Sequence, residues 1–312
     1  MNFEEQNGLI LLDKSQGMTS FSCDGLIKKL LHTKKVGHLG TLDPFATGLL
    51  PLCVGKGLRY VRFADGFDKA YRCTAVFGKK TDTMDIEGEV IGGRLPNSEE
   101  LVELQNSDFE SIRAAFDEIS KITSQVPPMF SAKKINGKKA YELAREGKEI
   151  ELKPVPVKIR KLSVISIDII ENMIEVIFEV SCSKGTYIRS LCDSVGDMTG
   201  FGAYAKTLRR IASGPFLEAD SYTFETIEKM ANEGDYSFIR DASSIIVEMP
   251  SIELNDKEAA DIKLGRKISA ERFSSDMDDG LHRAMYEGKV IAVVYKADEK
   301  GRSIIRIERM LA

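Results

Sequence analysis

Residues 37–50 read GHLGTLDPFATGLL and place one carboxylate, Asp43, among three glycines and directly before Pro44. A residue that precedes proline is kept out of helical dihedrals and favours an extended or turn conformation. The glycines at 37, 40 and 48 permit tight turns and the close approach of a ligand to the backbone. An Asp-Pro pair among glycines is most often an ordinary turn, but the same pattern suits a rigid loop that presents a nucleophile or a base.

The composition is that of a soluble globular protein. The chain has 312 residues, 43% of them hydrophobic and 29% charged, which is enough for two domains. The N-terminal sequence MNFEEQNGLILLDK has acidic residues before a short apolar run, unlike a signal peptide. No apolar stretch approaches the roughly 18 residues that span a bilayer. We expect a cytoplasmic protein that does not contact a membrane.

The cysteines and histidines do not have the spacing of metal ligands. The five cysteines include no CxxC pair, and the three histidines are scattered. We therefore expect no metal site, and reduced, mostly buried thiols.

The formal net charge of −4 argues against a protein that coats nucleic acid non-specifically, but one segment is basic. Between residues 133 and 148, six basic side chains face two acidic ones, which gives a local net charge of +4. Such a run is most often a solvated face, although it also suits phosphate binding.

The hydrophobic pattern predicts interleaved strands and helices. Strands are expected at residues 9–12, 49–54, 69–77, 155–170, 173–181, 290–295 and 303–307. Helices are expected at residues 20–31, 57–64, 99–122, 140–145, 188–199 and 257–264. Because no regular βαβ rhythm is present, we predict an α+β fold with a mixed, largely antiparallel central sheet flanked by helices. A linker at residues 249–251 predicts two domains, 1–248 and a small β-rich domain at 249–312.

Further motifs follow the Asp43 loop in a recognisable order. They are LLDKSQGMTS at 11–20, YRCTAVFGKKTDTMD at 71–85, PPMFSAKKINGKKAYELAR at 127–145, CSKGTYIR at 182–189 and LRR at 208–210. Together with residues 37–50 they resemble the TruB-type tRNA pseudouridine synthases over about residues 8–220. Ser15 stands where that family has proline, and Phe130 where it commonly has tyrosine.

The resemblance implies a fold and a reaction. It implies the pseudouridine-synthase fold, with an RNA-binding insertion at about residues 124–153 and a PUA-like RNA-binding domain at 249–312. The implied activity is isomerisation of the T-loop uridine of tRNA (position 55 in tRNA numbering) to pseudouridine after nucleotide flipping. Nothing is oxidised or lost in this reaction, so no cofactor is expected. The implied partner is the tRNA T-arm, bound by a monomer that requires no protein partner.

The resemblance also assigns roles to single residues. Asp43 is the essential residue and Arg189 its ionic partner, a bidentate guanidinium that lowers the carboxyl pKa. Tyr71 stacks on the target base, and its phenol takes part in removal of the C5 proton. Without the motifs, a surface arginine and a core tyrosine would be the ordinary interpretations.

The remaining candidates are expected to bind or position the RNA. Tyr187 and Leu208 line the pocket, and His38 fills the space of the flipped base or packs beside it. Lys14 and Asp85 orient neighbouring loops or the RNA, and Lys133 and Lys134 bind the RNA. The ordinary alternative is a structural role for each of them.

Three other functions remain open. One is a guide-dependent, dyskerin-type RNA pseudouridine synthase, and another is a catalytically silent tRNA-binding or tRNA-folding protein. The joint presence of Asp43, Tyr71 and Arg189 argues against a silent protein. A hydrolase with paired carboxylates ranks last, because no second carboxylate stands out.

Overall fold

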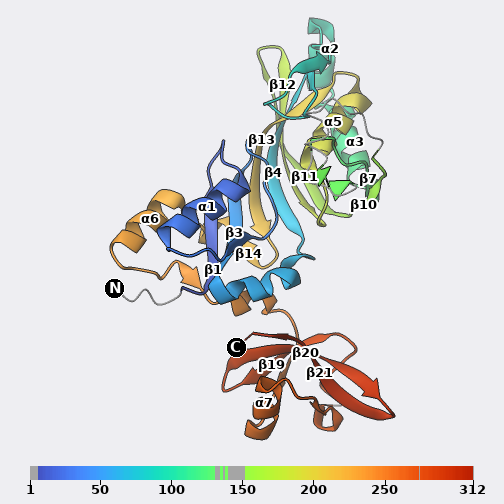
Figure 1. Ribbon diagram of the computed structural model, residues 1–312. Helices are drawn as coiled ribbons and strands as arrows, with labels where there is room; N and C mark the ends of the chain where they lie inside the picture. The colour runs from blue at the N-terminus through green and yellow to red at the C-terminus, as the bar shows by residue number, and fades with distance from the viewer. Residues whose placement is uncertain (1–5, 131–133, 136–137, 140–151, 274, 312) are drawn as a thin grey trace.

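The computed structural model describes residues 6–130, 134–135, 138–139, 152–273 and 275–311, and its centre is one mixed β-sheet (Figure 1). In spatial order its strands are β11 (Ile159–Ile170), β12 (Met173–Cys182), β4 (Lys69–Phe77), β13 (Ala203–Ser213), β3 (Thr47–Val54), β1 (Gly8–Lys14) and β15 (Tyr222–Thr223). Along this path β13/β3 and β1/β15 are parallel, and the other neighbours are antiparallel. The predicted largely antiparallel, mixed sheet is confirmed.

Strand β1 shows how the sheet is buried on both faces. Its apolar run is continuous, as expected for a strand covered on both sides. Ile10 and Leu12 point into the larger hydrophobic cluster, whereas Leu9 and Leu11 point into a second cluster on the opposite face. The alternation of side chains along one strand therefore serves two separate cores.

Helices cover one face of the sheet. They are α1 (Ser20–Leu30), α3 (Glu110–Ile119), α5 (Ile188–Thr199) and α6 (Phe224–Asn232), and all four contribute to the larger cluster. Figure 1 shows α1 and α6 beside β1 and β3, and α3 and α5 toward the β11–β12 end. The side chain of Thr19 caps α1 by accepting from the Ser22 backbone, and Gly200 ends α5 with a φ of 75°.

The opposite face carries two 3₁₀ helices and the C-terminal β-rich domain. The 3₁₀ helices are η1 (Gly55–Ala64) and η3 (Ala242–Ile246). The C-terminal sheet has the order β17 (Ser251–Glu253), β19 (Leu281–Tyr286), β20 (Lys289–Glu299), β21 (Arg302–Met310) and β18 (Ile268–Ser269), with α7 (Asp256–Lys263) packed on it. Val293 and Leu311 join the second cluster, and Arg62 pairs with Glu308 at 2.5 Å. These contacts attach the C-terminal domain to the main sheet.

Short segments complete the described residues. They are β2 (Val36–His38), β5 (Lys80–Thr81), β6 (Val90–Gly92), α2 (Ser98–Asn106), β7 (Ser124–Gln125), β8 (Lys134–Ile135), β9 (Lys138–Lys139), β10 (Val155–Pro156), β14 (Phe216–Leu217), η2 (Glu218–Asp220), β16 (Ile239–Arg240) and η4 (Glu271–Phe273). β7 pairs with β10, so the two ends of the segment at about 124–153 lie side by side.

Several predicted elements match the structure, and others differ. The strand at 69–77, the helix at 188–199 and the hairpin turn at 171–172 are confirmed. The single helix predicted over 99–122 is wrong, because Asp108 and Phe109 take positive φ values of 50° and 56° and separate α2 from α3. The helix predicted at 140–145 lies outside the described residues. Strand β13 was not predicted.

No helix among the described residues is sufficiently long and hydrophobic to cross a membrane. All five cysteines are buried and free.

Two helical glycines give opposite predictions for stability. A β-carbon on Gly196 in α5 would collide with the backbone at Gly202 and Ala203, whereas a β-carbon on Gly25 in α1 would meet no atom within 4 Å. Gly25→Ala should stabilise the protein by about 0.5–1 kcal/mol through helix propensity. Gly196→Ala should destabilise it by at least about 2 kcal/mol, because the overlap is with backbone. Denaturant unfolding measures both, and a stabilised Gly196→Ala variant would contradict the described contact of α5 with β13.

Candidate active site

The Asp43 loop connects β2 to β3 and is fixed by contacts on both sides of the carboxylate. The Ser20 hydroxyl accepts from the Leu42 backbone nitrogen at 2.9 Å and lies 3.1 Å from the Leu42 carbonyl oxygen. The Pro44 carbonyl accepts from the Gly17 backbone nitrogen at 2.8 Å. The start of α1 and the turn before it therefore hold the loop, as the proline and glycine pattern suggested.

Lys14 supports this loop from behind. Its side chain is buried, and its ammonium donates to the carbonyls of Ser15, Met18 and Pro44 at 3.0, 2.7 and 3.1 Å. Burial lowers the pKa of Lys14 from its ordinary value, and the nearby Cys23 and Asp43 oppose that change. The described geometry thus places Lys14 against the backbone of the loop.

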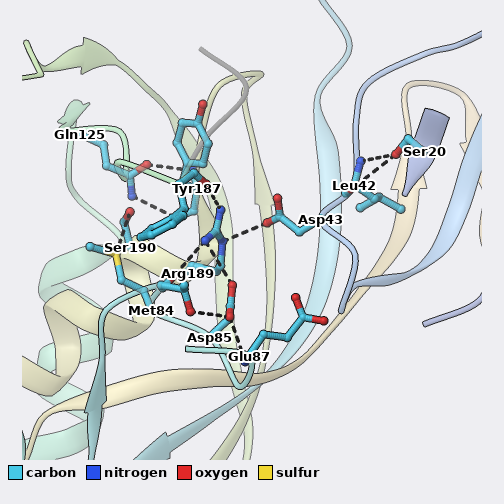
Figure 2. A network of polar contacts seen from close by, with 12 residues as sticks. Ser20, Leu42, Asp43, Met84, Asp85, Glu87, Gln125, Tyr187, Arg189 and Ser190 are labelled. Atoms are coloured by element: carbon cyan, nitrogen blue, oxygen red, sulfur yellow. Dashed lines mark hydrogen bonds and ion pairs between the residues drawn. The ribbon is translucent and has the colours of Figure 1, made fainter. Parts of the chain in front are cut away.

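Arg189 lies in the first turn of α5 and connects the loop to two other segments (Figure 2). Its Nε lies 2.9 Å from Oδ2 of Asp43, and its Nη1 donates to the Thr83 carbonyl at 2.7 Å and to Asp85 Oδ2 at 3.2 Å. Nη2 donates to the Phe130 carbonyl at 2.7 Å. The expected pair of Arg189 and Asp43 is present, but the expected bidentate geometry is wrong because the other nitrogens are occupied.

Asp85 completes the charged cluster. It is buried, and its Oδ1 accepts from the Thr83 hydroxyl at 2.6 Å and from the Glu87 backbone nitrogen at 3.1 Å. The segment that carries Asp85 is joined to β13, because the Ala205 backbone nitrogen donates to the Met84 carbonyl at 3.0 Å. Asp85 therefore contacts Arg189 but is not among the residues that line the pocket beside Asp43.

The electrostatics of Asp43 differ from the prediction. Its side chain is 36% exposed, compared with 4% for Arg189. Burial raises the pKa of the Asp43 carboxyl above its ordinary value, and the charge of Asp85 adds to that effect, while Arg189 and Lys14 oppose it. Arg189 does act to lower this pKa, as expected, but the cost of burying the carboxylate outweighs the attraction of the guanidinium, so the net change is upward.

A cavity of about 220 Å³ opens beside Asp43. Its walls come from the Asp43 loop, from β4 and β13, and from the CSKGTYIR segment. The lining residues are Gly40, Thr41, Leu42, Asp43, Lys69, Tyr71, Ser183, Gly185, Thr186, Tyr187, Ile188, Arg189 and Leu208. Five predicted site residues therefore share one pocket: Asp43, Tyr71, Tyr187, Arg189 and Leu208.

Tyr71 and Tyr187 are positioned in different ways. Tyr71 is buried in β4, where burial raises the pKa of its phenol and Arg210 opposes that change. The backbone of Tyr187 is clamped by Gln125, which accepts from its nitrogen at 2.8 Å and donates to its carbonyl at 3.1 Å. Gln125 was not predicted, because nothing in the sequence connects β7 with a residue more than 60 positions away.

The other predicted residues lie at the rim of the pocket or outside the described part of the chain. His38 Nδ1 lies 3.0 Å from Asp24 Oδ2, and its Nε2 lies 3.2 Å from the Thr41 hydroxyl. Because Thr41 lines the pocket, His38 lies beside it and not within it. The side chains of Lys133 and Lys134 lie outside the part of the chain that the structure describes.

Two basic residues at the site were not predicted from the sequence. Lys69 lines the pocket and lies two residues before Tyr71 on the same strand, so alternation along β4 could have found it. Arg210 is completely buried beside the pocket and belongs to the LRR motif, of which only Leu208 was singled out. Within the described ranges, no cluster of three or more His, Cys, Asp or Glu residues could hold a metal ion.

The raised pKa of Asp43 makes a prediction for its titration. A ¹³C NMR titration, assigned with Asp43→Asn, should place the carboxyl midpoint above the ordinary value of about 3.9. The folded state then binds the proton more tightly than the unfolded state does. The contribution of Asp43 to the free energy of unfolding should therefore fall as the pH rises from its pKa in the unfolded state to its pKa in the folded state. A midpoint at or below the ordinary value would show that the guanidinium dominates after all.

Comparison with known proteins places this site in a family. The model described as "TruB family pseudouridylate synthase (N terminal domain)" matches residues 28–188, and "tRNA pseudouridylate synthase B C-terminal domain" matches residues 189–243. The tRNA pseudouridine synthase B of Geobacillus thermodenitrificans is 35% identical over 93% of this chain and 95% of its own length. That of Listeria monocytogenes is 34% identical over 98% of both.

Solved structures agree at the level of the fold. The crystal structure of a Cbf5–Nop10–Gar1 complex matches with a TM-score of 0.71 and 23% identity, covering 98% of this chain and 85% of that one. An archaeal box H/ACA sRNP Nop10–Cbf5 complex matches with a TM-score of 0.69 and 22% identity, covering 99% and 87%. The two family models and the relatives that match over nearly the whole chain agree, and the chain belongs to the TruB family of pseudouridylate synthases.

Proposed function

We propose that this protein isomerises the T-loop uridine of tRNA, at position 55, to pseudouridine. One observation carries the proposal: the Asp43 carboxylate lies 2.9 Å from a buried guanidinium on the wall of a pocket that also contains Tyr71. The relatives that match over nearly the whole chain are named tRNA pseudouridine synthase B, which supports tRNA as the substrate.

The reaction requires few groups, and the pocket contains candidates for them. The N1–C1′ bond breaks, the same base rotates, C5 bonds to C1′, and the C5 proton leaves while N1 gains one. A carboxylate held by Arg189 can serve as a nucleophile at C1′, as a stabiliser of positive charge on the sugar, or as a base. In this proposal Tyr71, on the wall formed by β4, stacks on the target base, and its phenol takes part in removal of the C5 proton. Product and substrate are isomers, so the residues need no cofactor.

The nucleotide must leave the stack before it reaches Asp43. Flipping costs a few kcal/mol, and less in an RNA loop than in a duplex. The apolar side chain of Leu208 and the ring of Tyr187 give the flipped base an apolar environment inside the pocket. His38, whose Nε2 lies 3.2 Å from the hydroxyl of the pocket residue Thr41, would occupy the space that the flipped base leaves or pack beside it.

Two further segments are proposed to bind the RNA. The segment at about 124–153 is an insertion in the catalytic domain of residues 1–248, and the pairing of β7 with β10 at its base supports this assignment. Its lysines, including Lys133 and Lys134, would contact phosphates. The β-rich domain at 249–312 would act as a PUA-like module that contacts the tRNA outside the loop.

A guide-dependent activity is the second candidate, because the Cbf5 complexes share the fold. We favour direct action on tRNA, since those structures are only 22–23% identical whereas the tRNA enzymes are about 35% identical. In this proposal the protein acts as a monomer without a protein partner. The decisive observation is whether the purified protein forms pseudouridine in a tRNA transcript without added protein or guide RNA.

The first prediction concerns Asp43. Asp43→Asn should lower the single-turnover rate constant for pseudouridine formation by about 10²–10⁴-fold, because the amide cannot act as nucleophile or base. The affinity for tRNA should change little. Chemical mapping of pseudouridine measures the rate, and filter binding measures the affinity. Asp220→Asn, an exposed residue, is the control. Near wild-type turnover in Asp43→Asn would refute the proposed role.

The second prediction concerns the insertion. Lys133→Ala/Lys134→Ala should weaken tRNA binding and reduce the slope of log K against log salt by about 0.7–0.9 for each phosphate that the variant no longer binds. Lys121→Ala, an exposed lysine that pairs with Glu118, should leave the slope unchanged. If the double variant keeps the wild-type slope, these two lysines do not contact the RNA.

A further inference from the structure

Arg210 is a buried cation whose position is defined by the sheet. On β13 it lies directly opposite Tyr71 of β4 and Gly48 of β3. Directly opposed residues of an antiparallel pair have neighbouring side chains on the same face. Arg210 and Tyr71 are therefore neighbours, two positions along β13 from the pocket residue Leu208. The adjacent Arg209 points to the other face, where it binds Asp13 and Glu218.

The guanidinium of Arg210 donates hydrogen bonds to two backbone carbonyls. Its Nε donates to the Leu49 carbonyl at 2.6 Å, and its Nη2 donates to the Gly40 carbonyl at 3.1 Å. Nη1 is buried and has no hydrogen-bond partner among the described residues. Nor does any carboxylate in the described ranges lie within ion-pair distance of Arg210. Both carbonyls belong to the strand and loop that carry Asp43.

The free nitrogen lies directly behind the pocket wall. A β-carbon on Gly40, which lines the pocket, would lie 3.6 Å from Nη1 of Arg210 and 3.0 Å from Cε of Lys69. Gly40 has a φ of 88°, so a glycine is needed here for conformation as well as space. The positive charge is thus brought close to the pocket without being exposed in it.

Burying a cation without a counter-charge has a high free-energy cost. The hydrogen bonds of Arg210 to the two backbone carbonyls do not require a charge. Removing a charge from water without pairing it costs several kcal/mol, and neutral donors can bind two carbonyls as well. The neighbouring group whose ionisation the positive charge can favour is the Tyr71 phenol. The other groups that affect its ionisation, Cys182 and Asp43, both disfavour the anion.

We propose that Arg210 is a positioning residue for Tyr71: two backbone carbonyls hold its guanidinium against the phenol, where the positive charge stabilises the phenolate. The inference rests on the proposed function, because in that function the phenolate acts as the base that accepts the C5 proton. The phenol releases its proton to water. After C5 has bonded to C1′, the phenolate oxygen takes the C5 proton and the C5–H electron pair forms the C5=C6 double bond. The C6=N1 electron pair moves onto N1, which takes a proton from water.

The test is a titration of Tyr71 in the full-length protein without RNA. The ultraviolet absorbance of tyrosinate is followed against pH, and subtraction of the Tyr71→Phe variant isolates this residue from the other tyrosines. Arg210→Gln removes the charge but can still donate to a carbonyl. It should raise the midpoint of Tyr71 by about 1–3 pH units, the effect expected from one nearby charge. Arg210→Lys, which keeps the charge, should raise it less, and Arg209→Gln should leave it unchanged.

The rate of pseudouridine formation then tests the role in the reaction. In Arg210→Gln the single-turnover rate constant near neutral pH should fall by about 10–10³-fold, in step with the smaller phenolate fraction, and should partly recover at higher pH. In the Tyr71→Phe background the same substitution should have little further effect. If Arg210→Gln does not fold, Arg210→Met, which brings no polar group of its own into this buried position, replaces it.

Two results would overturn the inference. One is an unchanged Tyr71 midpoint in a folded Arg210→Gln or Arg210→Met variant, which would make Arg210 a structural tether only. The other is a shifted midpoint with an unchanged pH dependence of the rate. The first result does not depend on the proposed function, because the titration is read without substrate. A failure of the proposed function, in which wild-type protein forms no pseudouridine in tRNA, therefore remains distinguishable.

Discussion

The buried guanidinium of Arg189 is the contact on which the site depends. It joins the Asp43 loop, the Thr83–Asp85 turn and the Phe130 carbonyl, which are distant in sequence. Each of its contacts is to a carboxylate or a backbone oxygen, so the charge is compensated although the side chain is only 4% exposed. Loss of this one side chain would leave Asp85 buried without its cation, and truncating one partner of a buried pair costs several kcal/mol.

The sheet explains why the other pocket residues meet there. Strands β3, β13 and β4 are neighbours, so the Asp43 loop, Leu208 and Tyr71 reach the same region from three strands. Glycine at position 48 allows β3 and β13 to approach, because a β-carbon there would lie 2.5 Å from the Arg210 carbonyl oxygen. Arg189 and Arg210 approach the pocket from different elements. Arg189 pairs with carboxylates, whereas Arg210 donates hydrogen bonds to backbone carbonyls.

The sequence predicted the structural features that depend on local patterns and on motifs. Alternation was sufficient for β4, and the motifs singled out five residues that share the pocket. It did not predict features that depend on long-range contacts: Gln125 clamps Tyr187 across 62 positions, and Arg210 is placed by strand pairing. The direction of the Asp43 pKa also required the structure, because a sequence names the charged partner but not the degree of burial.

The proposed function requires that the pocket beside Asp43 receives a flipped uridine. A crystal structure of the Asp43→Asn variant with a T-arm RNA would test this requirement. We expect one uridine turned out of the loop, its C1′ facing residue 43 and its base against Tyr71. An RNA bound with every base outside the pocket, or a base whose sugar faces away from residue 43, would contradict it.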